Sequence, residues 1–253
     1  MPTALITGAS AGLGAAFARR LAGDGFTLVI NGRDAGRLRS AAQELHRRYG
    51  ATVETLPADL AAEEGIAAVE ERLRAGVDLL VNNAGFGHRD VYLKVPVEDE
   101  RRMLTLHCEA VLRLTSAALP GMAARRRGGV INVGSVAAFL PSDTTYGPSK
   151  AWVVAFSQTA AGQVAGTGVR VMALCPGFTH TEFHQRSGQD ISGIPEFMWL
   201  DADRVVATAM RDFARGLRVS VPDPRYKAIV ALARLIPPNL AGRLAELFAD
   251  RLR

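Results

Sequence analysis

Short β-rich runs alternate with longer helical patterns along almost the whole chain. The longer patterns carry apolar residues at the three- and four-residue spacing of a helix that faces a core. Strands alternating with helices of this length form βαβ units around a parallel sheet, and right-handed crossovers place helices on both faces. We therefore predict an α/β fold with a doubly wound parallel sheet. The expected strands are residues 4–7, 27–31, 52–57, 78–82, 129–133, 169–175 and 218–221, and the expected helices are residues 13–21, 34–49, 62–75, 98–120, 147–165 and 202–214.

Two regions interrupt this alternation. Residues 177–200 hold Gly, Pro, Ser and aromatic residues without a clear period, which is typical of a functional loop. Residues 224–253 form a tail with two helical patterns around Pro237 and Pro238. No repeat or linker divides the chain, so we predict one domain over residues 1–253. The apolar residues expected to line one face of the first tail helix are Ile229, Val230, Leu232, Leu235 and Ile236.

The charge balance is basic but scattered. The chain has 30 Lys and Arg residues against 25 Asp and Glu residues, a formal net charge of +5. Its dense run, Arg125, Arg126 and Arg127, is typical of a solvated loop between a helix and a strand. We therefore expect no nucleic-acid partner, although a positive field suits a ligand that carries phosphate.

The apolar and cysteine content indicates an intracellular protein. No run of about 18 apolar residues predicts a transmembrane helix, and no basic region precedes the first apolar run as in a signal peptide. The two cysteines, Cys108 and Cys175, are typical of reduced thiols in so long a chain. We therefore expect a cytoplasmic location.

A glycine-rich turn follows the first strand. Gly8, Gly12 and Gly14 lie between that strand and the first helix. Glycines there allow a tight turn and let backbone N–H groups approach a pyrophosphate, while the helix N-terminus adds partial positive charge. The context predicts a dinucleotide site rather than a merely flexible turn.

The end of the second expected strand bears on the choice of nucleotide. Enzymes that prefer NADH usually carry an acidic residue about 20 residues past the glycines, where it holds the ribose hydroxyls. This chain has Asn31, Gly32 and Arg33 there, while Asp34 stands where the next helix needs an N-cap. Because Arg33 can pair with a ribose 2′-phosphate, we predict NADPH. The alternative is that Arg33 is one more surface arginine.

A tyrosine and a lysine four residues apart supply candidate acid–base chemistry. Tyr146 and Lys150 share one helical face, since positions i and i+4 are neighbours. A nearby ammonium is expected to lower the pKa of the phenol. Tyr146 can then give a proton to a carbonyl oxygen or take one from an alcohol. A nucleotide cofactor would carry out the hydride chemistry.

With these residues the chain resembles the short-chain dehydrogenase/reductase family in its single-domain, NADP-preferring form. The resemblance implies a Rossmann-type sheet of about seven strands, a carbonyl or alcohol substrate, and homodimers or homotetramers through helices near 98–120 and 147–165. It implies catalytic roles for Ser135, Tyr146 and Lys150, with Lys150 also bonding the nicotinamide ribose. The remaining implied cofactor-binding residues are Thr7, Gly8, Ser10, Gly12, Leu13, Gly14, Asp59, Leu60, Asn83, Ala84, Gly85, Pro176, Gly177, Thr179 and Thr181.

His107 departs from the family pattern, which usually has asparagine in the long helix that follows an Asn-Asn-Ala-Gly motif, residues 82–85 in this chain. It could relay protons itself, since imidazole titrates near neutral pH. It could instead be a structural replacement with slower turnover, or mark a chain that binds cofactor without efficient catalysis. No partner ligands at suitable spacing make a metal site of His107 and Cys108, so we expect no metal.

The leading hypothesis is an NADPH-dependent reductase that interconverts a ketone and a secondary alcohol. Aromatic residues make the 177–200 segment apolar, so it could form a lid over a lipophilic substrate or simply pack on the sheet. One of His180 and His184 could touch that substrate. The alternatives are an NADP-binding sensor without catalysis and a membrane-surface contact through the tail. The lid candidates are Phe178, Phe183, Phe197, Met198 and Trp199.

Overall fold

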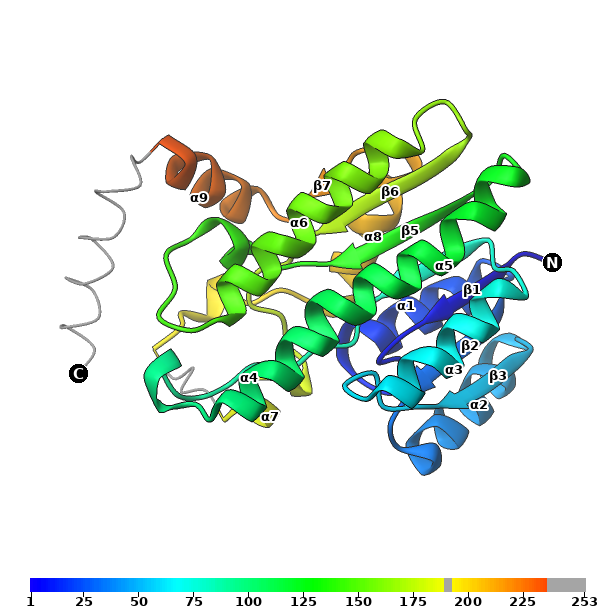
Figure 1. Cartoon of the computed structure of the whole chain (residues 1–253), viewed down its shortest axis with the longest axis horizontal. Coiled ribbons are helices and arrows are strands. Elements are labelled where there is room, and N and C mark those ends of the chain that lie inside the picture. The colour runs from blue at the N-terminus through cyan, green and yellow to red at the C-terminus, as the bar shows by residue number, and fades with distance from the viewer. Residues whose placement is uncertain (189–192, 236–253) are drawn as a thin grey trace.

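A parallel β-sheet forms the centre of the computed structural model, which describes residues 1–188 and 193–235 (Figure 1). The sheet in this part of the chain has seven strands in the order β3-β2-β1-β4-β5-β6-β7, and all neighbouring pairs are parallel. This order confirms the predicted doubly wound fold. The strands are β1 (Thr3–Ile6), β2 (Thr27–Gly32), β3 (Val53–Pro57), β4 (Leu79–Asn82), β5 (Gly128–Val133), β6 (Val169–Leu174) and β7 (Val219–Ser220).

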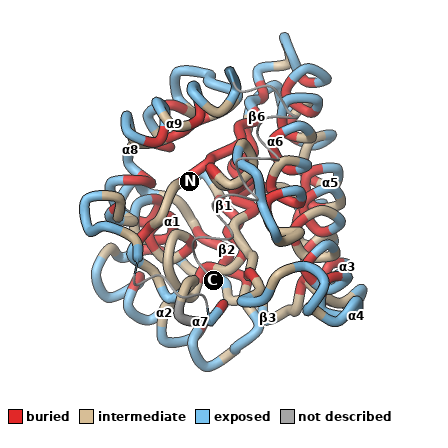
Figure 2. The backbone as a smooth tube through the Cα atoms, turned by 90° about the vertical axis from the view of Figure 1, so that its left-hand side faces the viewer, coloured by how far each residue is buried: buried red, intermediate tan, exposed pale blue. Residues whose placement is uncertain are grey.

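Helices cover both faces of the sheet, because successive strand side chains point to opposite sides. Ile6 of β1 packs in one apolar layer with α1, α2 and α8, whereas its neighbour Leu5 packs with α3, α5 and α6 on the other. Figure 2 shows the buried strands between these two layers. The helices are α1 (Gly12–Gly23), α2 (Ala35–Tyr49), α3 (Glu63–Arg74), α4 (Val97–Leu104), α5 (Ala110–Ala124), α6 (Tyr146–Gln163), α7 (Glu182–Ser187), α8 (Ala202–Ala214) and α9 (Pro224–Leu235).

The helix predicted over residues 98–120 is not one regular helix. Between α4 and α5 lies a π-helical turn, η2 (Thr105–Glu109), and α5 then continues through Pro120 to Ala124. Insertions of this kind bend a helix and often occur at functional sites. The turn contains His107, the residue that departs from the family pattern.

Two local predictions hold at the ends of helices. Asp34 caps α2, since its carboxylate accepts hydrogen bonds from the N–H groups of Gly36 and Arg37. The run of Arg125 to Arg127 is exposed and links α5 to β5.

The prediction that five apolar residues share one face of the first tail helix agrees with the structure only for Ile229 and Val230. In α9 the buried residues are Tyr226 and Val230, while Leu232 and Leu235 are exposed. Tyr226, Ile229 and Val230 pack into the apolar layer on this side of the sheet, and α9 contacts the short helix η3 (Val136–Phe139). Ile236 and the second tail pattern lie outside the described residues.

Candidate active site

A cavity of about 730 Å³ opens at the carboxyl ends of the strands. Its walls include residues that directly follow β1, β4, β5 and β6, such as Gly8, Asn83, Gly134 and Pro176. The strand order reverses between β1 and β4, and open α/β sheets bind ligands at that point.

Most of the predicted site residues come together on this cavity. The exceptions are Thr7, Gly14 and His107, which lie behind its walls. Those that line it are Gly8, Ser10, Gly12, Leu13, Arg33, Asp59, Leu60, Asn83, Ala84, Gly85, Ser135, Tyr146, Lys150, Pro176, Gly177, Thr179 and Thr181.

The glycine-rich turn is as tight as the sequence predicts. Gly8 and Gly12 have φ values of +64° and +53°, a region that side chains rarely adopt. A Cβ on Gly14 would lie 2.2 Å from the Gly8 carbonyl oxygen. Because Gly8, Gly12 and Gly14 have no side chains, the start of α1 packs against the turn and bare backbone forms this part of the cavity wall.

Thr7 and Asn83 join this turn to the one after β4. The Thr7 hydroxyl accepts hydrogen bonds from the N–H groups of Asn83 and Ala84, at 2.9 and 3.0 Å. The Asn83 amide in turn donates to the carbonyl oxygens of Thr7 and Gly8. Thr7 thus supports the wall from behind, although the resemblance implied cofactor contact.

The end of β2 offers groups that fit a nucleotide. The Arg33 side chain is exposed at the cavity and makes no ion pair with any described residue. Asn31 is buried beside it, and its Oδ1 has no hydrogen-bond partner among the described residues. A buried acceptor without a partner is costly, so a ligand that donates a hydrogen bond there would satisfy it.

Asp59 and Leu60, two of the implied cofactor-binding residues, form another part of the cavity wall. Asp59 accepts a hydrogen bond from the N–H of Ala61, which fixes the turn after β3. Arg102 of α4, which the sequence analysis did not single out, reaches across the cavity mouth to within 3.7 Å of the Asp59 carboxylate.

Ser135, Tyr146 and Lys150 meet at the opposite end of the cavity. Ser135 follows β5 and accepts the Ala137 N–H at 3.1 Å, and its hydroxyl is near enough to the Tyr146 phenol to lower the pKa of that phenol. Lys150 is buried, and its Nζ donates to the Val133 carbonyl at 2.9 Å and lies 5.7 Å from the centre of the Tyr146 ring. The helical spacing of Tyr146 and Lys150 and the end of β5 therefore place a phenol, an amine and the Ser135 hydroxyl at the same end of the cavity.

The predicted direction of the Tyr146 pKa was wrong. Burial raises the pKa of Tyr146 to about 12, which outweighs the lowering by the hydrogen bond with Ser135. Burial also lowers the pKa of Lys150 to about 8. The cause is common to both, since a buried site disfavours each charged form. Tyr146 is therefore protonated at neutral pH and suited to donate a proton.

His107 is fully buried and hydrogen-bonded at both ring nitrogens. Its Nε2 accepts the N–H of Phe86 at 3.2 Å, so in the neutral ring Nδ1 carries the proton. Nδ1 lies 2.9 Å from the Ser149 hydroxyl, which donates to the carbonyl of Tyr146. Burial and the Lys150 charge hold the pKa of His107 well below its usual value. The imidazole thus joins the loop after Gly85 to the first turn of α6.

Aromatic residues of the 177–200 segment divide into two groups. Phe178, Phe183 and His184 line the cavity, and the Phe183 ring centre is 5.8 Å from that of Tyr146. The other lid candidates do not: Phe197 is 64% exposed, and Met198 packs against the core.

Trp199 supports this wall from outside the cavity. Its ring stacks on His180 at 4.8 Å and also contacts Phe178 and His184. His184, rather than His180, is thus the histidine beside the cavity, whereas His180 is exposed and paired with Glu196.

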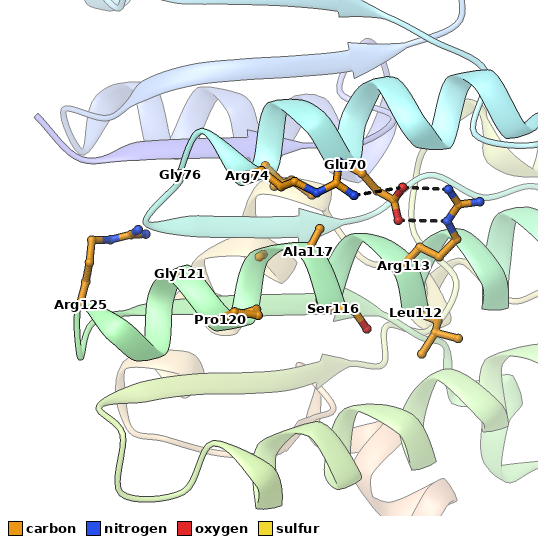
Figure 3. Close-up of a pocket in the computed structure, with 12 residues that line it drawn as sticks. Glu70, Arg74, Gly76, Leu112, Arg113, Ser116, Ala117, Pro120, Gly121 and Arg125 are labelled. Atoms are coloured by element: carbon orange, nitrogen blue, oxygen red, sulfur yellow. Dashed lines mark hydrogen bonds and ion pairs between the residues drawn. The ribbon is translucent and has the colours of Figure 1, made fainter.

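A second hollow of about 650 Å³ lies between α3 and α5 (Figure 3). The Glu70 carboxylate lies between Arg113 and Arg74 there, 2.8 Å from the former. None of the predicted site residues lines it. Within residues 1–188 and 193–235, no three His, Cys, Asp or Glu side chains are grouped to hold a metal. The same residues form no helix with both the length and the hydropathy to cross a bilayer.

Comparisons with known proteins agree with this geometry. A family model described as short chain dehydrogenase matches residues 2–192. An NADP-dependent 3-hydroxy acid dehydrogenase from Salmonella typhi is 38% identical over 188 residues, which are 71% of this chain and 73% of that protein.

Two solved structures extend the similarity to the fold. A short-chain dehydrogenase from Sphingobium yanoikuyae in complex with NADPH has a TM-score of 0.85 at 35% identity, over 94% of this chain and 97% of that one. A bulky-bulky ketone specific alcohol dehydrogenase from Comamonas testosteroni has a TM-score of 0.79 at 32% identity, over 100% of this chain and 92% of that one.

Proposed function

The chain belongs to the short-chain dehydrogenase/reductase family of NAD(P)-dependent oxidoreductases that act on CH–OH groups, and from this premise we propose that it reduces a lipophilic ketone to a secondary alcohol with NADPH. The observation that carries the proposal is geometric: the Tyr146 phenol and the Ser135 hydroxyl line one cavity, with the buried Lys150 amine 5.7 Å from the centre of the Tyr146 ring. A phenol that holds its proton can donate it to a carbonyl oxygen, and we therefore propose the direction of ketone reduction.

The residues around Tyr146 have separate roles in this proposal. The Ser135 oxygen already accepts a backbone N–H, so its own proton is free to bind the substrate carbonyl oxygen beside the phenol. Tyr146 donates a proton to that oxygen. NADPH, when bound, supplies the hydride to the carbonyl carbon, which balances the reduction. Lys150 stabilises the phenolate left on Tyr146.

The Arg33 side chain supports NADPH over NADH. Its guanidinium lies at the cavity, where NADH enzymes usually carry an acid, and makes no ion pair within residues 1–188 and 193–235. The glycine turn and the Asn31 Oδ1, which has no partner in the part of the chain that the structure describes, fit a dinucleotide of either kind in the same part of the cavity. The related structures and sequences described as NADPH-bound or NADP-dependent are consistent with this preference.

The lipophilic substrate is inferred from the wall that faces Tyr146. Phe183 lies beside Tyr146, and Phe178 and Leu140 line the same cavity; apolar walls favour apolar ligands. The description of the Comamonas relative as specific for bulky ketones is consistent with such a wall.

The test is NADPH consumption over ketones graded in size and polarity, with NADH in parallel. We expect the highest kcat/KM for a bulky apolar ketone with NADPH. Turnover restricted to small polar carbonyls would contradict the substrate class. Tight NADPH binding without turnover of any carbonyl would favour a sensor on the same fold.

A further inference from the structure

Tyr226, at the start of α9, contacts both sides of the neck of the 177–200 segment, which we call the substrate loop. We define the neck as residues 178–180 and 198–200, where the loop leaves the core and returns to it. The Tyr226 side chain is buried, with the residue 2% exposed. Its hydroxyl accepts the N–H of Phe178 at 3.1 Å and donates to the carbonyl of Met198 at 2.9 Å. Both hydrogen-bonding capacities of this phenol are therefore used on the two strands of the neck.

The neck itself has little pairing of its own. Thr179 and Leu200 form an isolated parallel bridge, supported by hydrogen bonds from the N–H of Leu200 to Phe178 and from that of His180 to Leu200. A short bridge outside the main sheet is a weak connection. The Tyr226 hydroxyl adds a bond on each strand next to this bridge.

The Tyr226 ring also determines how close α9 lies to the cavity wall. A Cβ on Gly177 would lie 2.1 Å from Cζ of this ring, so the ring lies against bare backbone. Gly177 and its neighbours Pro176, Phe178 and Thr179 line the cavity. The ring thus packs behind the wall that contains Gly177, on the side away from the cavity that a cofactor or substrate would fill.

The start of α9 is itself fixed. Asp223 pairs with Arg225, accepts its N–H and receives the N–H of Lys227 on its carbonyl. Burial raises the pKa of the Tyr226 phenol, so its proton stays available for Met198. A rigid helix start therefore carries the hydroxyl that holds the loop.

We propose that Tyr226 is a positioning residue that fixes the neck of the substrate loop, and with it Phe183 and His184, over the reacting groups. The proposal rests on the proposed function in that the loop covers the substrate. Tyr226 acts through the loop, so its loss would weaken substrate binding more than it slows the proton transfer of Tyr146. The alternative is that Tyr226 only fills the core beneath Gly177.

The variant Tyr226→Phe separates these interpretations, because it keeps the ring and removes only the hydroxyl. Tyr49→Phe is the matched control, on the last turn of α2 and away from the cavity. Backbone amide exchange is measured by NMR, with steady-state kinetics on the best ketone. We expect the Phe178 amide to exchange roughly tenfold faster, while the Lys227 amide in the same helix is unchanged. We expect kcat/KM to fall roughly tenfold, mainly through KM.

Wild-type protection of the Phe178 amide in Tyr226→Phe would overturn the proposal, and so would faster exchange with unchanged kcat/KM. If the wild-type protein reduces no ketone, the proposed function fails on its own. The exchange rate of the Phe178 amide then still shows whether Tyr226 holds the neck. The NADPH dissociation constant of Tyr226→Phe shows whether the neck also positions the cavity wall that contains Gly177.

Discussion

His107 Nδ1 lies 2.9 Å from the hydroxyl of Ser149, and that hydroxyl donates to the carbonyl oxygen of Tyr146. The other ring nitrogen accepts the N–H of Phe86, just after Gly85 of the cavity wall. A Cβ on Gly85 would lie 2.9 Å from that nitrogen, so the imidazole fits only beside a glycine. Of the three interpretations of His107, this arrangement favours the structural replacement, in which a neutral ring connects the loop to the start of α6.

His107→Phe is expected to lower kcat on the best ketone about 10- to 100-fold, because an apolar ring replaces the imidazole and the N–H of Phe86 and the Ser149 hydroxyl lose their buried partner. His107→Gln, which restores a donor and an acceptor, is expected to recover part of this loss. His46→Phe on exposed α2 serves as the control. Steady-state kinetics with saturating NADPH measures the effect, and wild-type kcat in His107→Phe would contradict the role.

The pH dependence of reduction is expected to follow Lys150. Its buried amine has a pKa of about 8, so the ammonium that supports Tyr146 is present below that pH and is lost as the pH rises through it. We therefore expect kcat/KM for ketone reduction to fall above pH about 8. Lys150→Arg should be slower throughout but lack this limb, since arginine keeps its charge. A wild-type profile that stays level to pH about 10 would show that the ammonium is not required.

Arg33→Ala is expected to raise KM for NADPH about 10- to 100-fold with little change for NADH, because charge-assisted bonds to phosphate are strong. Arg39→Ala, an exposed arginine of α2 that does not line the cavity, is the matched control. Initial rates with each nucleotide provide the measurement. An equal rise in KM for NADPH and for NADH would contradict this role and indicate that Arg33 is an ordinary surface arginine.

Phe183→Ala is expected to raise KM for a bulky ketone about tenfold while leaving NADPH affinity unchanged, since burial of a large apolar side chain against substrate is lost. Phe197→Ala is the control within the same segment, because Phe197 is exposed and absent from the cavity wall. The two KM values are compared on one bulky and one small ketone. A similar effect of both variants would indicate general loosening of the segment rather than a contact with substrate.

The fold was predictable because local and global signals agree along the chain. Strand and helix periods, the Asp34 cap and the glycines at positive φ all specify the same doubly wound sheet. That most candidate site residues lie on one cavity was predictable, because parallel strands bring the segments after β1, β4, β5 and β6 to one edge, whereas the roles of these residues stay predictions. The division into one domain, the oligomeric state and the role of the tail beyond residue 235 stay predictions.

What the sequence did not indicate depends on burial and on contacts between distant segments. The raised pKa of Tyr146 follows from burial, which the i and i+4 spacing of Tyr146 and Lys150 does not reveal. Ser149 lies between these two residues in the sequence, yet nothing there links it to His107 in the π-turn. Tyr226 lies 49 positions after Gly177 in an apolar tail, and only the packed structure shows the ring against that glycine.

The proton-donor role of Tyr146 is tested most directly by measuring NADPH affinity and ketone turnover in wild-type protein and in Tyr146→Phe. The variant keeps the buried ring and removes the hydroxyl that Ser135 contacts. For Tyr146→Phe we predict the same NADPH dissociation constant as in the wild-type protein. We predict that its ketone turnover is reduced by about 100- to 10,000-fold, the range for loss of a general acid. Turnover in Tyr146→Phe within a few-fold of wild type would contradict the account.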